Sequence, residues 1–198
     1  MSATPLLVVL TGPSGVGKDT VLAALRNADG RNYGFPVNAT TRHRRPDEKE
    51  GVDYYFVSKD EFARRLARGD FLEHATVYGQ EKGVLKAQVR DLLRSGRDTV
   101  LRTDVQGARY IKSRVPGVVT IFIAPPSFGE MEKRMRSRGG DSPDQVELRL
   151  KTARAEISAA DEFDYTVVND DLAHCLAEIE AIIDRERSRP GRAPTVVS

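Results

Sequence analysis

Residues 12–20 read Gly-Pro-Ser-Gly-Val-Gly-Lys-Asp-Thr, and they follow an apolar run at Leu6–Leu10. The next stretch, Lys18–Asn27, has the apolar spacing of a helix. The pattern GxxxxGK between a strand and a helix is typical of a phosphate-binding loop, or P-loop. Its glycines let backbone N–H groups turn toward phosphate oxygens, and the helix N-terminus adds partial positive charge. Lys18 can carry an ammonium to the β- and γ-phosphates. This stretch therefore predicts an α/β protein that binds a nucleotide.

The residue after Lys18 is Asp19, where many P-loops carry the Ser or Thr that touches Mg²⁺. Thr20 is one place further on. Mg²⁺ prefers oxygen ligands and keeps several of its waters. Three arrangements therefore stay open: the metal is held through Thr20, through water, or chiefly by the phosphates.

Further apolar runs, rich in branched residues, alternate with helical patterns along the chain. These predicted strands are Thr99–Thr103, Val118–Ala124 and Tyr165–Val168, and the helix after the last has Leu172, Leu176, Ile179 and Ile183 on one face. Strands that are apolar on both faces and separated by helices predict a parallel sheet with helices on both sides.

Two stretches interrupt this alternation. Residues 36–88 are polar and aromatic, with a short strand at Asp53–Val57 and a helix near Glu61–Arg68. Residues 127–160 are almost wholly helical and strongly charged, and Ser142-Pro143-Asp144-Gln145 is a capping box. We therefore expect a core made of residues 1–35, 89–126 and 161–190, an inserted mixed lobe at 36–88, a lid at 127–160, and a loose tail at 191–198.

Composition narrows the class of protein. The 198 residues carry a net charge of +2, which does not favour a general nucleic-acid binder. Basic residues cluster at 42–45 and 133–138, as binding a compact polyanion requires, although solvated surface charge is the alternative. Cys175 is the only cysteine, so a reducing compartment is expected. Leu6–Leu10 is too short for a membrane span or signal segment, so we expect a cytoplasmic protein that binds no membrane.

Several segments after the P-loop resemble the guanylate kinase family in order and spacing. They are Asn38-Ala-Thr-Thr-Arg42, Arg45-Pro-Asp-Glu48, Gly51-Val-Asp-Tyr54-Tyr-Phe-Val57, Phe71-Leu-Glu73, Asp104-Val-Gln-Gly107, Phe122-Ile-Ala-Pro-Pro-Ser127 and Val168-Asn-Asp170. The resemblance covers about residues 5–185 and implies a P-loop NTPase-type core with an NMP-binding lobe and a helical lid. It further implies that the γ-phosphoryl group of ATP moves to GMP with Mg²⁺ as cofactor, leaves dGMP open as an acceptor, and implies no obligate protein partner.

Carried over residue by residue, the resemblance implies roles in three groups. For GMP the residues are Asn38, Arg42, Arg45, Tyr54, Glu73, Lys82, Val84 and Asp104, with Glu73 and Asp104 reading guanine. For ATP they are Gly12, Pro13, Ser14, Gly15, Val16, Gly17, Lys18, Asp19, Thr20, Arg138 and Asn169. The expected catalytic residues are Lys18, Arg45, Arg134, Arg138 and Arg149. Mg²⁺ is expected mainly on the ATP phosphates, near Thr20 and Asp104.

The chemistry of these side chains agrees with the implied roles. Arginine forks match phosphate oxygens in pairs, and Arg134 and Arg138 share one helix face. Guanine presents two adjacent donors, N1–H and its amino group, which one carboxylate can accept. Adenine presents an acceptor and a C–H there, so Glu73 would be unpaired against AMP. Without the surrounding motif, a glutamate in this setting is usually only a surface residue.

Three positions depart from the family pattern. The family often has Ser where Asn38 stands, and Tyr and Ser where Lys82 and Val84 stand. Asn38 can still hydrogen-bond a base, whereas Val84 cannot. Lys82 can replace the tyrosine hydroxyl with a charge-assisted bond to phosphate. The alternative is that Lys82 is solvated, or pairs with Glu81.

Two other functions are compatible with the P-loop. A ribose 1,5-bisphosphate phosphokinase has a similar loop in which Asp also follows the Lys, but the segment Arg42–Val57 and Glu73 argue against it. A catalytically silent, guanylate-kinase-like binding module is the other, and the presence of Lys18 and the basic residues argues against it. For GMP as acceptor no general base is needed, since a phosphate monoester with a second pKa near 6 is mostly a dianion at pH 7.

Overall fold

The computed structural model describes residues 4–77, 79–137 and 143–198. A sheet with the strand order β2-β7-β1-β8-β9 forms its core, and every neighbouring pair is parallel. The strands are β1 (Leu7–Thr11), β2 (Tyr33–Gly34), β7 (Asp98–Arg102), β8 (Val119–Ala124) and β9 (Tyr165–Val168). The predicted parallel α/β core is therefore confirmed.

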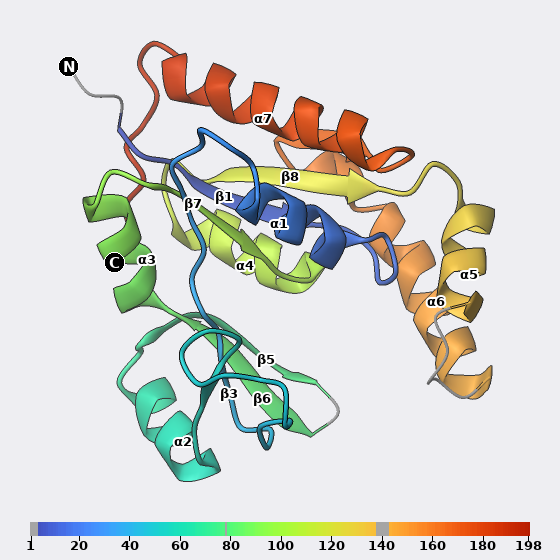
Figure 1. Ribbon diagram of the computed structural model, residues 1–198, viewed down its shortest axis with the longest axis horizontal. Helices are drawn as coiled ribbons and strands as arrows, with labels where there is room; N and C mark the ends of the chain where they lie inside the picture. The colour runs from blue at the N-terminus through green and yellow to red at the C-terminus, as the bar shows by residue number, and fades with distance from the viewer. Residues whose placement is uncertain (1–3, 78, 138–142) are drawn as a thin grey trace.

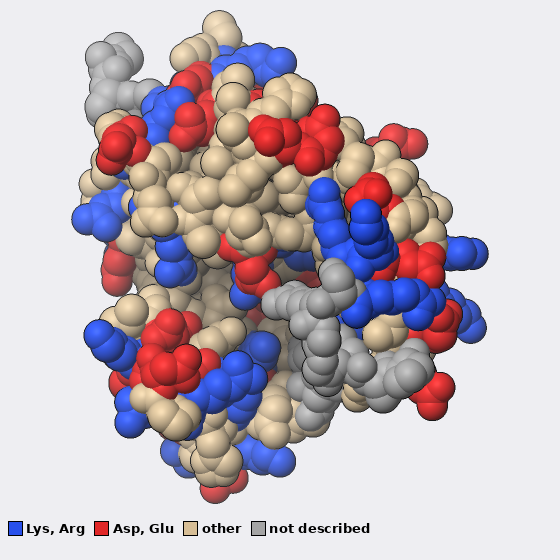
Figure 2. All heavy atoms as spheres, turned by 45° about the vertical axis from the view of Figure 1, so that its right-hand side comes forward, with Lys and Arg blue, Asp and Glu red and all other residues tan. Residues whose placement is uncertain are grey.

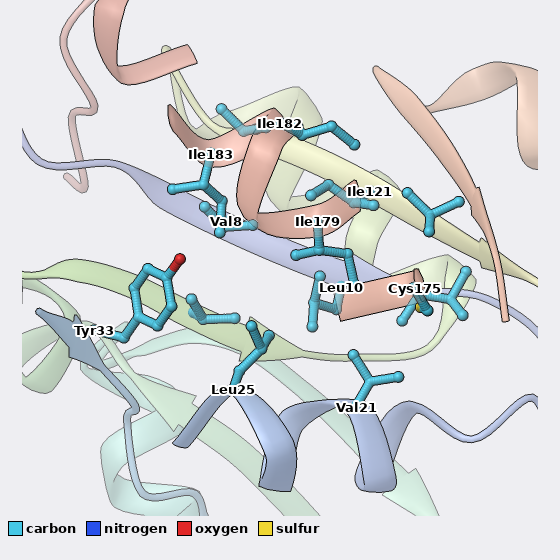
Figure 3. Packing of buried hydrophobic residues seen from close by; sticks show 14 of the residues in the cluster. Val8, Leu10, Val21, Leu25, Tyr33, Ile121, Cys175, Ile179, Ile182 and Ile183 are labelled. Carbon is cyan, nitrogen blue, oxygen red and sulfur yellow. The ribbon is translucent and has the colours of Figure 1, made fainter. Parts of the chain in front are cut away.

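Helices cover both faces of this sheet (Figure 1). They are α1 (Lys18–Arg26) and α7 (Leu172–Ser188) on one face, and α3 (Lys86–Arg94) and α4 (Val105–Arg114) on the other. Val8 and Leu10 of β1 belong to one buried cluster with Val21 and Leu25 of α1 and with Ile179 of α7 (Figure 3). Leu7 and Val9 point to the opposite face and pack with α3 and α4. Within the described ranges, no helix has the length and apolar character needed to cross a membrane.

The inserted lobe, residues 36–88, carries a second sheet with the strand order β4-β3-β6-β5. Its elements are β3 (Ala39–Thr40), β4 (Tyr55–Phe56), α2 (Lys59–Ala67), β5 (Phe71–Val77) and β6 (Gln80–Leu85). Strand β3 is parallel to β4 and antiparallel to β6, so the sheet is mixed. The rings of Phe62 and Phe71 stack with centroids 4.3 Å apart, which fixes α2 against the sheet. Figure 1 shows this lobe beside the carboxyl end of β7 and apart from α7.

The helical insert, residues 127–160, consists mainly of α5 (Phe128–Ser137) and α6 (Pro143–Ile157). Met131 and Met135 of α5 pack against Leu150 and Ala153 of α6. Figure 1 shows both helices beside the loop that joins β1 to α1. Ser142, the predicted N-cap of the second helix, lies outside the described residues.

The last residues differ from the predicted loose tail. Thr195 Oγ1 donates to the carbonyl of Gly117 at 3.0 Å, and Val196 N–H donates to the carbonyl of Pro116 at 3.2 Å. Arg90 donates to the carbonyl of Val197, whose side chain packs against the core cluster on the α4 face. The prediction rested on the high content of Pro, Gly and Arg in this segment. The carbonyl groups of Pro116 and Gly117, just before β8, offer hydrogen-bond acceptors that hold the segment against the core.

Candidate active site

The loop between β1 and α1 has the close turn that a phosphate cradle needs. Gly12 and Gly15 have φ angles of 140° and 82°, which residues with a side chain rarely adopt. A Cβ on Gly12 would lie 2.2 Å from the carbonyl oxygen of Ile123, and one on Gly15 would lie 2.7 Å from Cγ of Met135. Both the backbone and the available space therefore require glycine in this loop.

Lys18, the first residue of α1, is folded onto this loop. Its Nζ donates to the carbonyls of Gly12 and Pro13 at 2.6 and 3.0 Å. Burial lowers the pKa of the ammonium to about 8, although the carboxylate of Glu156 opposes the change. A partly desolvated ammonium favours an arriving anion, because the anion compensates its charge. Lys18 is therefore placed and charged to bind phosphate oxygens.

The helical insert contacts the P-loop directly through Ser14. The backbone N–H of Ser14 donates to Glu156 Oε2 of α6 at 3.1 Å. Arg149 donates from Nε and Nη2 to the Ser14 hydroxyl oxygen at 3.2 and 3.0 Å. Burial raises the pKa of Glu156. The sequence pattern did not single out Glu156, because one acidic residue on a charged helix gives no signal of its own.

Arg134 and Asn169 lie at the same place. Nη1 of Arg134 donates to the Asn169 carbonyl at 3.3 Å, and Nδ2 of Asn169 donates to the Val16 carbonyl at 2.7 Å. A cavity of about 780 Å³ is lined by Lys18, Arg134, Arg149, Asn169 and other residues of the P-loop and α5. The structure thus brings two of the three expected lid arginines to the P-loop. The third, Arg138, lies outside the described residues.

Asp19 and Arg102 form an ion pair at the start of α1. Nε of Arg102 lies 2.5 Å from Oδ1 of Asp19. Arg102 is the last residue of β7, which is hydrogen-bonded to β1. Thr20 is exposed and lines the same cavity as Lys18. Sequence reasoning missed Arg102, and its only signal was a charge at the carboxyl end of a buried strand.

Arg42 lies in a cluster of charged and aromatic residues in the inserted lobe. Its Nη2 is 2.5 Å from Oε1 of Glu48, and its guanidinium carbon is 5.5 Å from the ring centroid of Tyr54. The Glu48 carboxylate also accepts a hydrogen bond from the backbone N–H of Arg45 at 2.8 Å. The Arg42 guanidinium and this backbone bond lower the pKa of Glu48. Glu48, quoted only as part of a motif, therefore orients Arg42 and the loop that bears Arg45.

The three unusual positions fall into different surroundings. Nζ of Lys82 lies 5.8 Å from the centroid of the Tyr54 ring, so it faces the Arg42 cluster. Asn38 lines a small cavity together with Tyr54 and Arg102. Val84 is fully buried among the apolar residues under α3 and α4. The expected contact of Val84 with a ligand is at odds with this burial, because the side chain contributes to the core.

Glu73 is a nearly buried carboxylate, with 8 % of its surface exposed. Burial raises the pKa of Glu73 to about 7, and the nearby Asp104 carboxylate adds to the rise. Asp104 caps α4 and accepts from the Gly107 N–H at 2.8 Å. A Cβ on Gly107 would lie 2.8 Å from Oε1 of Glu73, so glycine makes room for the carboxylate. Both acidic residues line a cavity of about 540 Å³.

The surface is hollowed between the core and the inserted lobe (Figure 2). Basic and acidic side chains lie side by side around this hollow. The cavity at Lys18 and the cavity at Glu73 are lined by residues at the carboxyl ends of β1 and β7. Ligands of parallel α/β sheets bind at this end of the strands. The arrangement therefore offers one anionic-ligand site on the P-loop and a second, hydrogen-bonding site in the lobe.

Comparisons with known proteins agree with this arrangement. The family model described as guanylate kinase matches residues 4–186. A guanylate kinase of Symbiobacterium thermophilum is 44% identical over 187 residues, which cover 94% of this chain and 88% of the relative. One of Trichormus variabilis is 46% identical, with 89% and 88% covered. The crystal structure of guanylate kinase from Anaplasma phagocytophilum superposes with a TM-score of 0.74 at 34% identity, and covers 96% of this chain and 90% of that one. The chain belongs to the guanylate kinase family.

Proposed function

We propose that this chain is an ATP:GMP phosphotransferase that converts ATP and GMP to ADP and GDP. The observation that carries the proposal is the position of Glu73. Its carboxylate is nearly buried beside Asp104, and both line a cavity between the core and the inserted lobe. A buried acceptor is most stable when two donors face it, and guanine supplies two on one edge. GMP is therefore the nucleotide that fits this lobe.

The acceptor phosphate is assigned to the Arg42 cluster of the inserted lobe. Arg42 and Arg45 supply guanidinium groups, and Tyr54 supplies a phenol hydroxyl. Lys82 is assigned to the same phosphate because its ammonium faces the Tyr54 ring. Asn38 lines the neighbouring cavity with Tyr54, so its amide is assigned to GMP as well.

ATP is assigned to the P-loop, from Gly12 to Thr20, with Asn169 near the base. Lys18 exchanges the carbonyls of Gly12 and Pro13 for the β- and γ-phosphates when ATP binds. Arg134 and Arg149 reach the cavity from the helical insert and stabilise the transferred group. We assign Arg138 the same role from its sequence position only.

In the transfer, an oxygen of the GMP phosphate forms a bond to the γ-phosphorus, while the bond from that phosphorus to the β–γ bridging oxygen breaks. The electron pair of the broken bond stays on ADP, and no proton has to move. The GMP dianion is already a nucleophile, so catalysis consists of alignment and charge neutralisation. Residues 127–160 act as a lid in this proposal, excluding water that would otherwise hydrolyse ATP.

We propose Mg²⁺ as the divalent metal that accompanies ATP. Mg²⁺ takes oxygen ligands and is commonly held by one or two carboxylates together with substrate phosphates. Thr20 and Asp104 offer such oxygens, and the charge of the Asp104 carboxylate acts on Lys18. The metal would neutralise charge on the phosphates, and the protein residues would hold it in place. This donor set fits a metal bound mainly by ATP.

The proposal includes dGMP as a second acceptor, and a cytoplasmic location. Guanine reading by Glu73 does not depend on the ribose 2′-hydroxyl. The location is supported by Cys175, a buried free thiol that a reducing compartment would preserve.

A coupled assay of ADP release tests the function. ATP is supplied with GMP, AMP or ribose 1,5-bisphosphate, and only GMP should give rapid turnover. Glu73→Gln should reduce kcat/KM for GMP by about 30-fold to 1,000-fold, while AMP use falls less, because a charged acceptor is lost. Equal losses for GMP and AMP would make Glu73 a structural residue. Turnover with ribose 1,5-bisphosphate alone, or with none of the acceptors, would refute the proposed function.

A further inference from the structure

Arg102 lies where the two nucleotide sites meet. It ends β7, and its backbone pairs with Leu10 of β1 just before the P-loop. It lines the cavity of the P-loop and helical insert, which contains Lys18. It also lines the small cavity at the inserted lobe, which contains Asn38 and Tyr54. Arg102 therefore borders both the proposed donor site and the proposed acceptor site.

The charges around Arg102 are arranged for an anion. The guanidinium lies close enough to Lys18 to lower the pKa of that ammonium. The positive charges of Arg102 and Lys18 are therefore neighbours at the P-loop. The Asp19 carboxylate compensates the charge of Arg102, because its Oδ1 lies 2.5 Å from Nε of Arg102. Among the residues that the structure describes, no protein hydrogen bond reaches Nη1 or Nη2 of Arg102. The outer fork of this arginine thus remains available to phosphate oxygens.

We propose that Arg102 is a further catalytic residue, whose guanidinium binds the phosphoryl group in transit between ATP and GMP, and that Asp19 is its positioning residue. The proposal rests on the proposed function. In a loose transition state, charge spreads over the three equatorial oxygens of the transferred group. Lys18 approaches that group from the P-loop and Arg134 and Arg149 from the helical insert. Arg102 approaches the same group from the end of β7, so its guanidinium lies between the proposed ATP and GMP sites.

The positioning role of Asp19 follows from the geometry. An arginine has a long and flexible side chain, and fixing it in one position costs rotamer entropy. The ion pair at Nε restricts that freedom. It also explains why an acidic residue can follow Lys18 in this P-loop: its charge is balanced by Arg102.

Steady-state kinetics with GMP tests the proposal. Arg102→Ala should lower kcat by at least about 100-fold and change each KM less than about threefold, because the interaction forms in the transition state. Arg102→Lys, which keeps the charge but not the fork, should recover part of the loss. Asp19→Asn should lower kcat by about 3-fold to 10-fold. Arg94→Ala, at an exposed arginine of α3, is the matched control and should leave kcat within twofold of wild type.

A double variant separates catalysis from a structural ion pair. If Arg102 only balances Asp19, then Asp19→Asn should restore the activity of Arg102→Ala. The proposal requires that the double variant stays as slow as Arg102→Ala. Restoration, or kcat of folded Arg102→Ala within threefold of wild type, would overturn it. Wild type without GMP turnover would instead refute the proposed function itself.

Binding gives a readout that does not depend on turnover. A bisubstrate compound with adenosine and guanosine joined by five phosphates spans both sites. Calorimetry should show that Arg102→Ala weakens this compound by at least about 30-fold, while ADP and GMP alone change less than about threefold. Equal weakening of all three ligands would place Arg102 in ground-state binding and overturn the proposal. If Arg102→Ala does not fold, Arg102→Lys is measured in its place, with an expected weakening of at least about fivefold.

Discussion

The pH dependence of GMP binding tests the chemistry of Glu73. Burial raises its pKa to about 7 in the unliganded protein. Guanine N1–H and its amino group need a carboxylate acceptor, so only the ionised form of Glu73 is competent to bind GMP. Protonated Glu73 would present an O–H to one of those donors. The affinity for GMP should therefore fall as pH decreases through 7.

The size of the effect follows from the competent fraction. With a pKa of about 7, the ionised fraction is about 0.9 at pH 8 and about 0.1 at pH 6. Because apparent affinity scales with this fraction, the KM for GMP should rise about tenfold between pH 8 and pH 6. Protonation of the GMP phosphate, with its second pKa near 6, adds a factor of about two at pH 6.

The assay is KM for GMP at saturating ATP, measured between pH 6 and pH 8. Glu73→Gln is the control, because it retains the phosphate titration but has no carboxyl group to titrate. The ratio of KM at pH 6 to KM at pH 8 should be about tenfold larger in wild type than in the variant. Equal ratios in the two proteins would refute the reasoning that the ionised Glu73 carboxylate receives guanine.

Four further outcomes are expected. Lys18→Ala should keep the fold, judged by circular dichroism, and lower kcat by several orders of magnitude; near-normal turnover would refute its role. Arg149→Ala should lower kcat more than it raises the KM for GMP, and the opposite pattern would move this arginine to the acceptor site. Lys82→Ala should raise the KM for GMP several-fold, and Lys82→Tyr should bring this KM most of the way back to the wild-type value. The KM for ATP should not change in either variant. An unchanged KM for GMP in Lys82→Ala would show that Lys82 is a solvated residue that does not contact GMP. In urea unfolding without ligands, the free energy of unfolding of wild type should fall by up to about 3 kcal/mol between pH 4 and pH 8 relative to that of Glu73→Gln. The reason is that the pKa of Glu73 is 4.5 in the unfolded chain and about 7 in the folded protein. The same pH dependence of unfolding free energy in both proteins would contradict this cost of burial.

The stability effect has a definite sign. The folded state holds the Glu73 proton more tightly than the unfolded state does, because its pKa is raised by burial. The contribution of Glu73 to the free energy of unfolding is therefore most favourable below pH 4.5, and it decreases as pH rises through 7. Binding of GMP should offset this cost, since guanine donors compensate the buried charge.

The sequence by itself determined the core architecture. The run Leu6–Leu10, the glycine loop and the helix from Lys18 are local features, and each has its own physical signal in apolar spacing and backbone freedom. Likewise, strands that are apolar on both faces require helices on both sides, as β1 shows with Val8 and Val9 pointing to opposite clusters. The interruption of this pattern predicted an inserted lobe at residues 36–88 and a helical insert at residues 127–160.

Only the tertiary structure decided which charges meet. Asp19 and Arg102 come from separate elements that become neighbours when β7 pairs with β1. Ser14 meets Glu156 only because α6 folds back to the P-loop. Local patterns carry no information about such pairs, because an ion pair depends on distance in space.

Burial was the other property that composition could not supply. Val84 was expected at a ligand and lies in the core, while Glu73 lies in a desolvated site that raises its pKa. The tail at Thr195 was expected to be loose and is hydrogen-bonded to Gly117. A residue type sets which bonds a side chain can make, but its exposure, its pKa and its partners follow from the atoms that the fold packs around it.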